Sequence, residues 1–161
     1  MRGDPAVLDH LNVVLKNELT AVNQYFLHAR MLRHWGVTKL GVHEYDESID
    51  EMKHADMVIE RILFLGGMPR LVLDKLLIGE TVQQVLECDL CLEQQAIPQL
   101  REAIAHSEHV HDFVSRDLFA AILKAEEEHV DFLETQLELI PKIGIENYIQ
   151  LQSGAASPDP E

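Results

Sequence analysis

Apolar residues recur at the three- and four-residue spacing of an amphipathic helix along most of the chain, which predicts four long helices. Asp4 followed by Pro5 is typical of a helix start, and Gly66 followed by Gly67 is typical of a helix end. We expect Pro98 to bend or locally break the third helix, and the fourth helix to end before Pro141. The helices are expected at about residues 5–35, 38–66, 80–109 and 111–140, followed by a short fifth helix at 145–152.

Helices of this length span about 40 Å, and four of them indicate an all-α four-helix bundle. The segment GGMPRLVLDKLLIGE between the second and third helices has no sustained period but is too apolar for a solvated linker, so we expect an ordered crossover. A crossover of about fifteen residues can run the length of the bundle, which makes the second and third helices parallel. We expect one domain over residues 1–152 and a disordered tail, SGAASPDPE, over residues 153–161.

Carboxylates and imidazoles interrupt the apolar stripe of all four helices. On the second helix Glu51 and His54 share a face with Val58, because a helix turns about 100° per residue. The same Glu-x-x-His spacing recurs on the apolar face of the fourth helix, and the first and third helices each add one glutamate. The set is Glu18, Glu51, His54, Glu93, Glu126 and His129.

This set matches the ligand pattern of a di-iron carboxylate site, with one Glu from each of two helices and Glu-x-x-His from each of the other two. Four carboxylates carry a formal charge of about −4, which two Fe²⁺ ions cancel. Oxygen-rich ligation with two imidazoles suits iron or manganese, whereas a structural zinc site normally uses cysteine. The alternative interpretation is that these residues bind no metal and are merely paired with each other or partly solvated. The convergence of six such residues on one interior argues against that interpretation.

Composition narrows the function further. The 161 residues include 13 Lys plus Arg and 28 Asp plus Glu, a formal net charge of −15, which disfavours binding to nucleic acid or anionic membranes and attracts cations. The N-terminus lacks a signal-peptide pattern, and no apolar run is long enough for a membrane span, so we expect a cytoplasmic protein. Cys88 and Cys91 are interpreted as reduced thiols, because no second CxxC completes a four-cysteine metal site.

The segments NELTAVNQYFLHARM, EYDESIDEMKHADMVIERILFLGGMP and AEEEHVDFLE resemble bacterioferritin, the haem-containing ferritin of bacteria, and the resemblance reaches about residue 152. It implies a ferritin-like bundle that assembles into a hollow 24-subunit shell, oxidises Fe²⁺ with O₂ or peroxide, and stores the ferric mineral inside. It also implies roles for the residues: Glu51 and Glu126 bridge two irons, Glu18 with His54 and Glu93 with His129 complete the two sites, and Tyr25 packs beside them.

Met52 lies about 100° from Glu51, so it faces away from the metal ligands, and spacing alone favours a methionine at a dimer interface. The motif DEMKH changes that interpretation. The resemblance to bacterioferritin implies that Met52 and its symmetry mate ligate one haem b across a twofold axis. The residues that would line the haem pocket are Leu19, Val22, Asn23 and Phe26. The resemblance further implies that a small bacterioferritin-associated ferredoxin docks near the haem and supplies electrons for iron release.

Two departures from the family and several competing functions remain open. Pro98, about one turn beyond Glu93, is unusual in a ligand helix and could shift Glu93. Asp46 stands where family members often carry His, so an inner-surface iron site formed with Asp50 keeps oxygen ligands, but its electron-relay role becomes doubtful. The alternatives are a non-storing di-iron oxidase or peroxidase of the rubrerythrin type, a haem-binding electron carrier, and a DNA-protecting mini-ferritin. A rubrerythrin adds a four-cysteine iron domain that this sequence lacks, and the net charge disfavours DNA.

Overall fold

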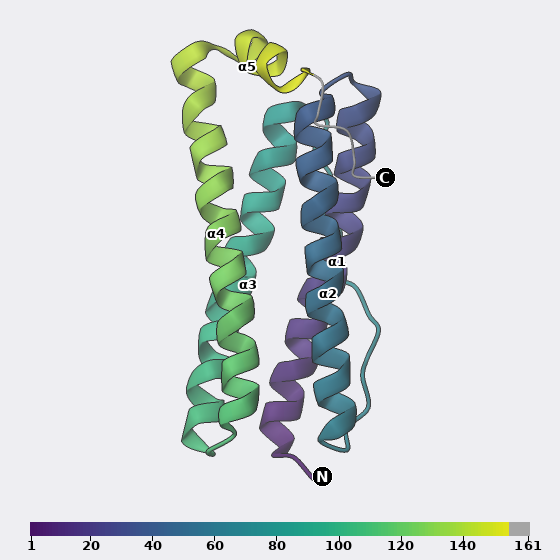
Figure 1. The fold of residues 1–161 in the computed structure, drawn as a ribbon, viewed down its shortest axis with the longest axis vertical. Coiled ribbons are helices and arrows are strands. Elements are labelled where there is room, and N and C mark those ends of the chain that lie inside the picture. The colour runs from purple at the N-terminus through teal and green to yellow at the C-terminus, as the bar shows by residue number, and fades with distance from the viewer. Residues whose placement is uncertain (155–161) are drawn as a thin grey trace.

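The computed structural model describes residues 1–154, and within them four long helices form a bundle with a fifth, short helix across its end (Figure 1). The predicted all-α bundle with a short fifth helix is confirmed, and no strand occurs in the described part of the chain. Of the expected disordered tail, residues 155–161 lie outside the described residues. The helices are α1 (Pro5–His34), α2 (Thr38–Phe64), α3 (Val82–His109), α4 (Phe113–Ile143) and α5 (Ile145–Gln152).

Side-chain caps fix the start of three helices. The Asp4 carboxylate accepts hydrogen bonds of 3.0 Å from the backbone N–H groups of Ala6 and Val7 at the start of α1. Thr81 caps α3 and Asp112 caps α4 in the same way. These contacts satisfy backbone donors that have no partner inside the helix, so the local sequence sets where each helix begins.

Both prolines that were expected to interrupt helices lie inside them. Pro98 does not break α3, which is continuous from Val82 to His109, and both Pro98 and Gln94, whose carbonyl loses its partner, are exposed to solvent. The prediction that the fourth helix ends before Pro141 is wrong: α4 continues to Ile143 and ends at Gly144, where φ is +84°. A position near the end of the helix leaves Pro141 few hydrogen bonds to disrupt.

The core is divided along the bundle into two apolar clusters with a polar layer between them. One cluster, which includes Leu11, Ile62 and Phe119, fills the end of the bundle near the N-terminus. The other, which includes Leu40 and Leu133, fills the end covered by α5. The apolar clusters hold the four helices together above and below the layer, so the helices position the polar side chains between them.

The segment 65–81 between α2 and α3 returns along the side of the bundle, so α2 and α3 run in the same direction, as predicted (Figure 1). Its backbone N–H groups bind polar side chains spaced four residues apart on α1, which orders it. The three hydrogen bonds run from Asp74 to Thr20 Oγ1 (3.0 Å), from Leu77 to Gln24 Oε1 (2.9 Å) and from Gly79 to His28 Nε2 (3.0 Å).

The leucines of this crossover contribute less to its order than the sequence suggested, because Leu71, Val72 and Leu73 are exposed in the single chain. Polar contacts to α1 hold the crossover, and of the apolar side chains that follow these three, only Leu76 and Leu77 are half-buried. Among the helices of the described residues, none is long and apolar enough to cross a membrane.

Candidate metal centre

The six predicted ligands converge in the polar layer at the middle of the bundle. Five of them are no more than 3% exposed, and only His54 is partly accessible. Their ligand atoms form two groups, each with all its atoms within 4.8 Å of one another. Glu51 and Glu126 belong to both groups, so two metal positions would share these carboxylates. The first group is Glu18, Glu51, His54 and Glu126, and the second is Glu51, Glu93, Glu126 and His129.

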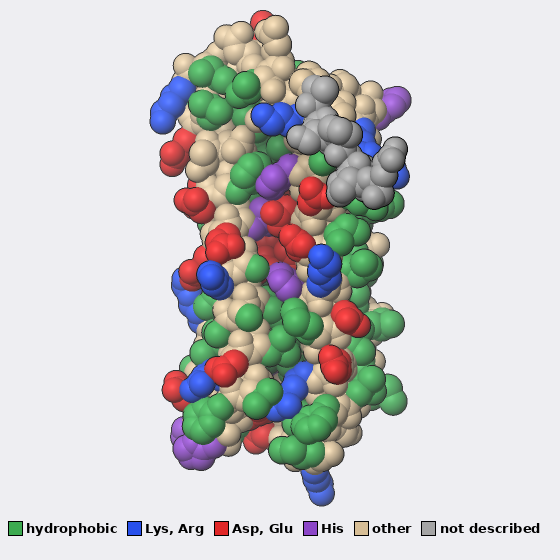
Figure 2. All heavy atoms as spheres, in the orientation of Figure 1, with side chains coloured by type: hydrophobic (Ala, Val, Ile, Leu, Met, Phe, Trp, Pro, Cys, Tyr) green, Lys and Arg blue, Asp and Glu red, His purple; other side chains and the backbone are tan. Residues whose placement is uncertain are grey.

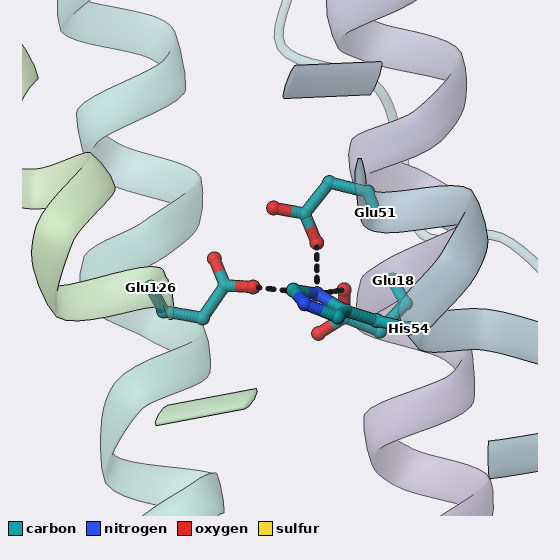
Figure 3. A group of neighbouring side chains, drawn as sticks. All are labelled: Glu18, Glu51, His54 and Glu126. Carbon is teal, nitrogen blue, oxygen red and sulfur yellow. Dashed lines mark hydrogen bonds and ion pairs between the residues drawn. The ribbon is translucent and has the colours of Figure 1, made fainter. Parts of the chain in front are cut away.

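In the first group the imidazole of His54 lies among three carboxylates that come from three different helices (Figure 3). Its Nδ1 atom is 3.3 Å from Glu18 Oε2, 3.4 Å from Glu51 Oε2 and 3.5 Å from Glu126 Oε1. The side chains in Figure 3 point toward one another across the bundle interior. One imidazole surrounded by three carboxylate oxygens has the donor chemistry of an iron or manganese site.

In the second group the imidazole of His129 pairs with Glu93, with 3.1 Å between Nδ1 and Oε1. The hydroxyl of Tyr25 donates a hydrogen bond to the same Glu93 oxygen. The Tyr25 ring also meets the His129 ring edge-on, with 5.1 Å between centroids and an interplanar angle of 83°. Tyr25 therefore contacts Glu93 and His129, two of the four residues of the second group, and packs beside them as the resemblance implied.

The electrostatics of the layer show why it suits cations. No Lys or Arg within the described chain forms an ion pair with any of the four ligand glutamates, so only imidazoles and shared protons balance them. Burial raises the pKa of Glu18 to about 7, and burial with repulsion from neighbouring carboxylates raises the pKa of both Glu51 and Glu126 well above the ordinary value. Without metal, these carboxyls therefore hold protons that metal ions would replace.

Glu93 and His129 are charged in the metal-free protein. Burial opposes the charge on Glu93, but hydrogen bonds from Glu126, His129 and Tyr25 outweigh it and lower its pKa. Burial also opposes the charge on His129, but the hydrogen bond to Glu93 outweighs it and raises the pKa of His129 to about 9. Two buried atoms at the centre have no hydrogen-bond partner, Glu126 Oε1 and His129 Nε2, although His54 lies 3.5 Å from the former. Buried ligand atoms without a hydrogen-bond partner fit a pair of metal ions.

A cavity of about 500 Å³ opens onto the site from the face formed by α2 and α4. Figure 2 shows the acidic and histidine side chains that gather in a furrow at the middle of this face. Three ligands line the cavity, together with residues that continue toward solvent. The lining is His43, Glu47, Asp50, Glu51, Lys53, His54, Met57, Ala125, Glu128, His129 and Phe132.

The sequence-predicted residues outside the six ligands lie in different places. Asp50 is exposed and lines the cavity, whereas Asp46 is exposed and is not part of its lining, so an inner-surface site formed by the two stays a prediction. Met52 is 50% exposed and faces away from the ligands, as its helical spacing indicated. Phe26, one of the residues expected beside it, is 46% exposed.

Sequence reasoning missed a second buried polar cluster, formed by His28, Glu44 and Asp89, all of which are fully buried. His28 Nδ1 donates to Asp89 Oδ1 over 2.8 Å, because its Nε2 accepts from the backbone of Gly79. Gln24 Nε2 donates to the same oxygen over 2.9 Å. Asp89 thereby orients two of the three side chains that hold the crossover. The four-residue spacing of Gln24 and His28 on α1 was the signal that could have revealed it.

The comparisons with known proteins agree with this geometry. A profile of the ferritin-like domain matches residues 8–143, so fold and ligand set together define a ferritin-like protein. The chain is 48% identical to the bacterioferritin of Brucella melitensis over 97% of this chain and 98% of that protein. It is 45% identical to the bacterioferritin of Rhodobacter capsulatus over 95% and 96%, and 46% identical to bacterioferritin BfrA of Mycobacterium tuberculosis over 92% and 94%. The chain belongs to the bacterioferritin family, as its motifs indicated.

Proposed function

We propose that this protein is an iron-storage ferroxidase, which oxidises Fe²⁺ with O₂ or peroxide at the six-residue centre and stores the ferric product. The observation that carries the proposal is the sharing of Glu51 and Glu126 between two groups of buried ligands. Such sharing holds two iron ions close enough to give up electrons to one oxidant molecule. A site for a single ion would need no second group.

The residues of the centre have different proposed roles in binding the two ions. Glu51 and Glu126 hold both ions, Glu18 and His54 complete one position, and Glu93 and His129 complete the other. When bound, two Fe²⁺ ions supply the two electrons that the oxidant takes.

The protein groups act through protons and orientation. Glu18, Glu51 and Glu126 release protons as the ions bind, because the raised pKa of each carboxyl reflects the absence of a cation. Tyr25 keeps Glu93 oriented by donating its hydroxyl hydrogen to it.

Storage follows from assembly, and we propose the hollow 24-subunit shell built from twofold dimers that the family resemblance implies. The named relatives are bacterioferritins along nearly their whole length, which supports this extension. The single chain also leaves apolar side chains of the crossover exposed, with Leu71 at 69%, Val72 at 52% and Leu73 at 49%. An exposed apolar strip of this kind is typical of a surface that another subunit covers.

We also propose that Met52 and its symmetry mate hold haem b at the twofold axis. The exposed thioether, with the exposed ring of Phe26 among the residues expected beside it, fits a group that binds between two subunits. When bound, the haem would carry electrons inward for reductive iron release, and a bacterioferritin-associated ferredoxin is the proposed donor. Met52→Leu is expected to remove the haem absorption bands and leave assembly and rapid iron oxidation unchanged. A normal bis-thioether spectrum in that variant would refute the ligand.

Anaerobic addition of Fe²⁺ followed by O₂ tests the ferroxidase proposal. We expect a fast phase for the first two irons per chain, then slower mineral growth inside particles of constant size. His129→Ala and Glu18→Ala should abolish the fast phase while the shell still assembles. Glu127→Gln is the matched control, because this neighbour of Glu126 is exposed and should keep the fast phase. Fast oxidation without mineral growth would instead indicate a non-storing di-iron oxidase.

A further inference from the structure

Glu47 lies between two imidazoles in the lining of the cavity on the α2–α4 face. Its Oε1 atom is 3.8 Å from His43 Nε2, and its Oε2 atom is 3.8 Å from His129 Nδ1. Both separations exceed the range of an N–H···O hydrogen bond. A carboxylate placed between two imidazoles without a hydrogen bond to either of them leaves a gap on each side.

The width of these gaps suits a metal ion. Nitrogen and oxygen ligands lie about 2.1 Å from a first-row divalent ion, so two ligands of one ion are about 3 Å apart at a right angle and about 4.2 Å apart in line. The 3.8 Å between His43 Nε2 and Glu47 Oε1 falls inside this window. The two side chains therefore need little movement to bind a common ion.

The structure holds His43 in place for this role. Its ring stacks on Phe132, with 3.7 Å between centroids and 16° between planes. Phe132 follows His129 by three residues on α4, so the stack ties His43 to the helix that carries a ligand of the metal centre. The Nδ1 atom of His43 is buried and has no hydrogen-bond partner, and the Nε2 atom faces Glu47.

Position and charge place this pair on a path to the centre. The side chains of His43 and Glu47 are 34% and 23% exposed, whereas that of His129 is 1% exposed. Asp50 and Glu128 add acidic groups to the same cavity lining, against one Lys53. The acidic mouth attracts cations, and an ion that enters from this face meets His43 and Glu47 before it meets His129.

We propose that His43 and Glu47 form a third cation station, which binds one divalent transition-metal ion, with water as its remaining ligands, between solvent and the di-iron centre. The inference rests on the proposed function, because the station serves iron on its way to or from that centre. It assigns a metal-binding role to His43, a residue with no place in the six-ligand set.

Anaerobic titration with Co²⁺ tests the station, because Co²⁺ binds nitrogen and oxygen ligands and gives visible ligand-field bands without being oxidised by the protein. The parent assembly should bind three ions per chain. His43→Phe keeps an aromatic ring to stack on Phe132 but removes both nitrogens, and Glu47→Gln removes the charge. Each should weaken the third ion at least about tenfold and leave the first two in place. Glu128→Gln, which alters the same cavity lining, should retain all three.

The outcomes separate this inference from the proposed function. Saturation of the parent at two ions per chain would overturn the station while preserving the di-iron centre, and so would a His43→Phe protein that binds the third ion normally. Failure of the parent to bind even two ions would instead overturn the centre itself. Stopped-flow oxidation gives a second readout: Glu128→Gln should oxidise added iron at the parental rate, and His43→Phe should oxidise it more slowly. Particle size and helical circular dichroism verify that each variant assembles.

Discussion

Binding of two metal ions to the metal-free protein should release protons in a number that the structure fixes. At neutral pH the carboxyls of Glu51 and Glu126 hold protons, because the pKa of each lies well above its ordinary value. Glu18, with a pKa of about 7, is half protonated, and His129, with a pKa of about 9, carries its proton. All four must lose these protons to become ligands, and so must any protonated His54, whose pKa is also raised, so we expect at least about three protons per chain over the first two equivalents.

Isothermal titration of Co²⁺ into the metal-free assembly, in buffers of different ionisation enthalpy, measures this number. Above about pH 8 the release should fall, because Glu18 is then ionised before the metal arrives. Glu127→Gln removes an exposed carboxylate and should leave the count unchanged. A release below about one proton per chain would mean that the buried glutamates are already ionised without metal. It would refute the account of how the fold tolerates them.

Three further perturbations test the surroundings of the centre. Tyr25→Phe leaves Glu93 without one donor and should cost about 1–3 kcal/mol of stability in the metal-free protein, measured by thermal unfolding, whereas Tyr45→Phe should cost almost nothing. Asp89→Leu leaves the donors of Gln24 and His28 unpaired, so amide exchange in the crossover should become faster. Asp89→Asn keeps an accepting oxygen and should leave the exchange rate nearly unchanged. Equal acceleration in both variants would contradict this account. The raised pKa of Glu18 contributes about 3 kcal/mol to stability, fully below about pH 4.5, and this contribution is lost as the pH rises through about 7. The unfolding temperature of the metal-free protein should therefore fall between about pH 5 and pH 8. Bound Co²⁺ should remove this fall.

The buried polar layer has a consequence for stability as well as for chemistry. Apolar clusters on both sides keep the four helices in place, and in the described chain the four ligand glutamates of the layer between them have imidazoles but no Lys or Arg as partners. Protons satisfy part of this layer in the metal-free protein, and cations would satisfy it more completely. The same buried carboxylates therefore destabilise the metal-free fold and favour the binding of metal ions.

The sequence by itself determined most helix bounds and which six residues share the inward faces, since both depend on local spacing. A period of 3.6 residues places Glu51 and His54 on the stripe that also carries Val58, and the stripe must face the core. Glu126 and His129 follow the same rule on α4. Length and capping residues then fixed the bundle, because helices of this size bury their stripes only against one another.

Only the tertiary structure decided the features that join residues distant in the chain. Pro98 is tolerated where both it and Gln94 are exposed, which depends on how α3 packs. The crossover is held by α1, and the approach of Glu47 to His129 needs α2 and α4 at their final separation. Local periodicity predicts which face of a helix turns inward, but it does not predict which side chain of another helix contacts that face. That information arises from packing, and it decides where a buried charge finds its partner.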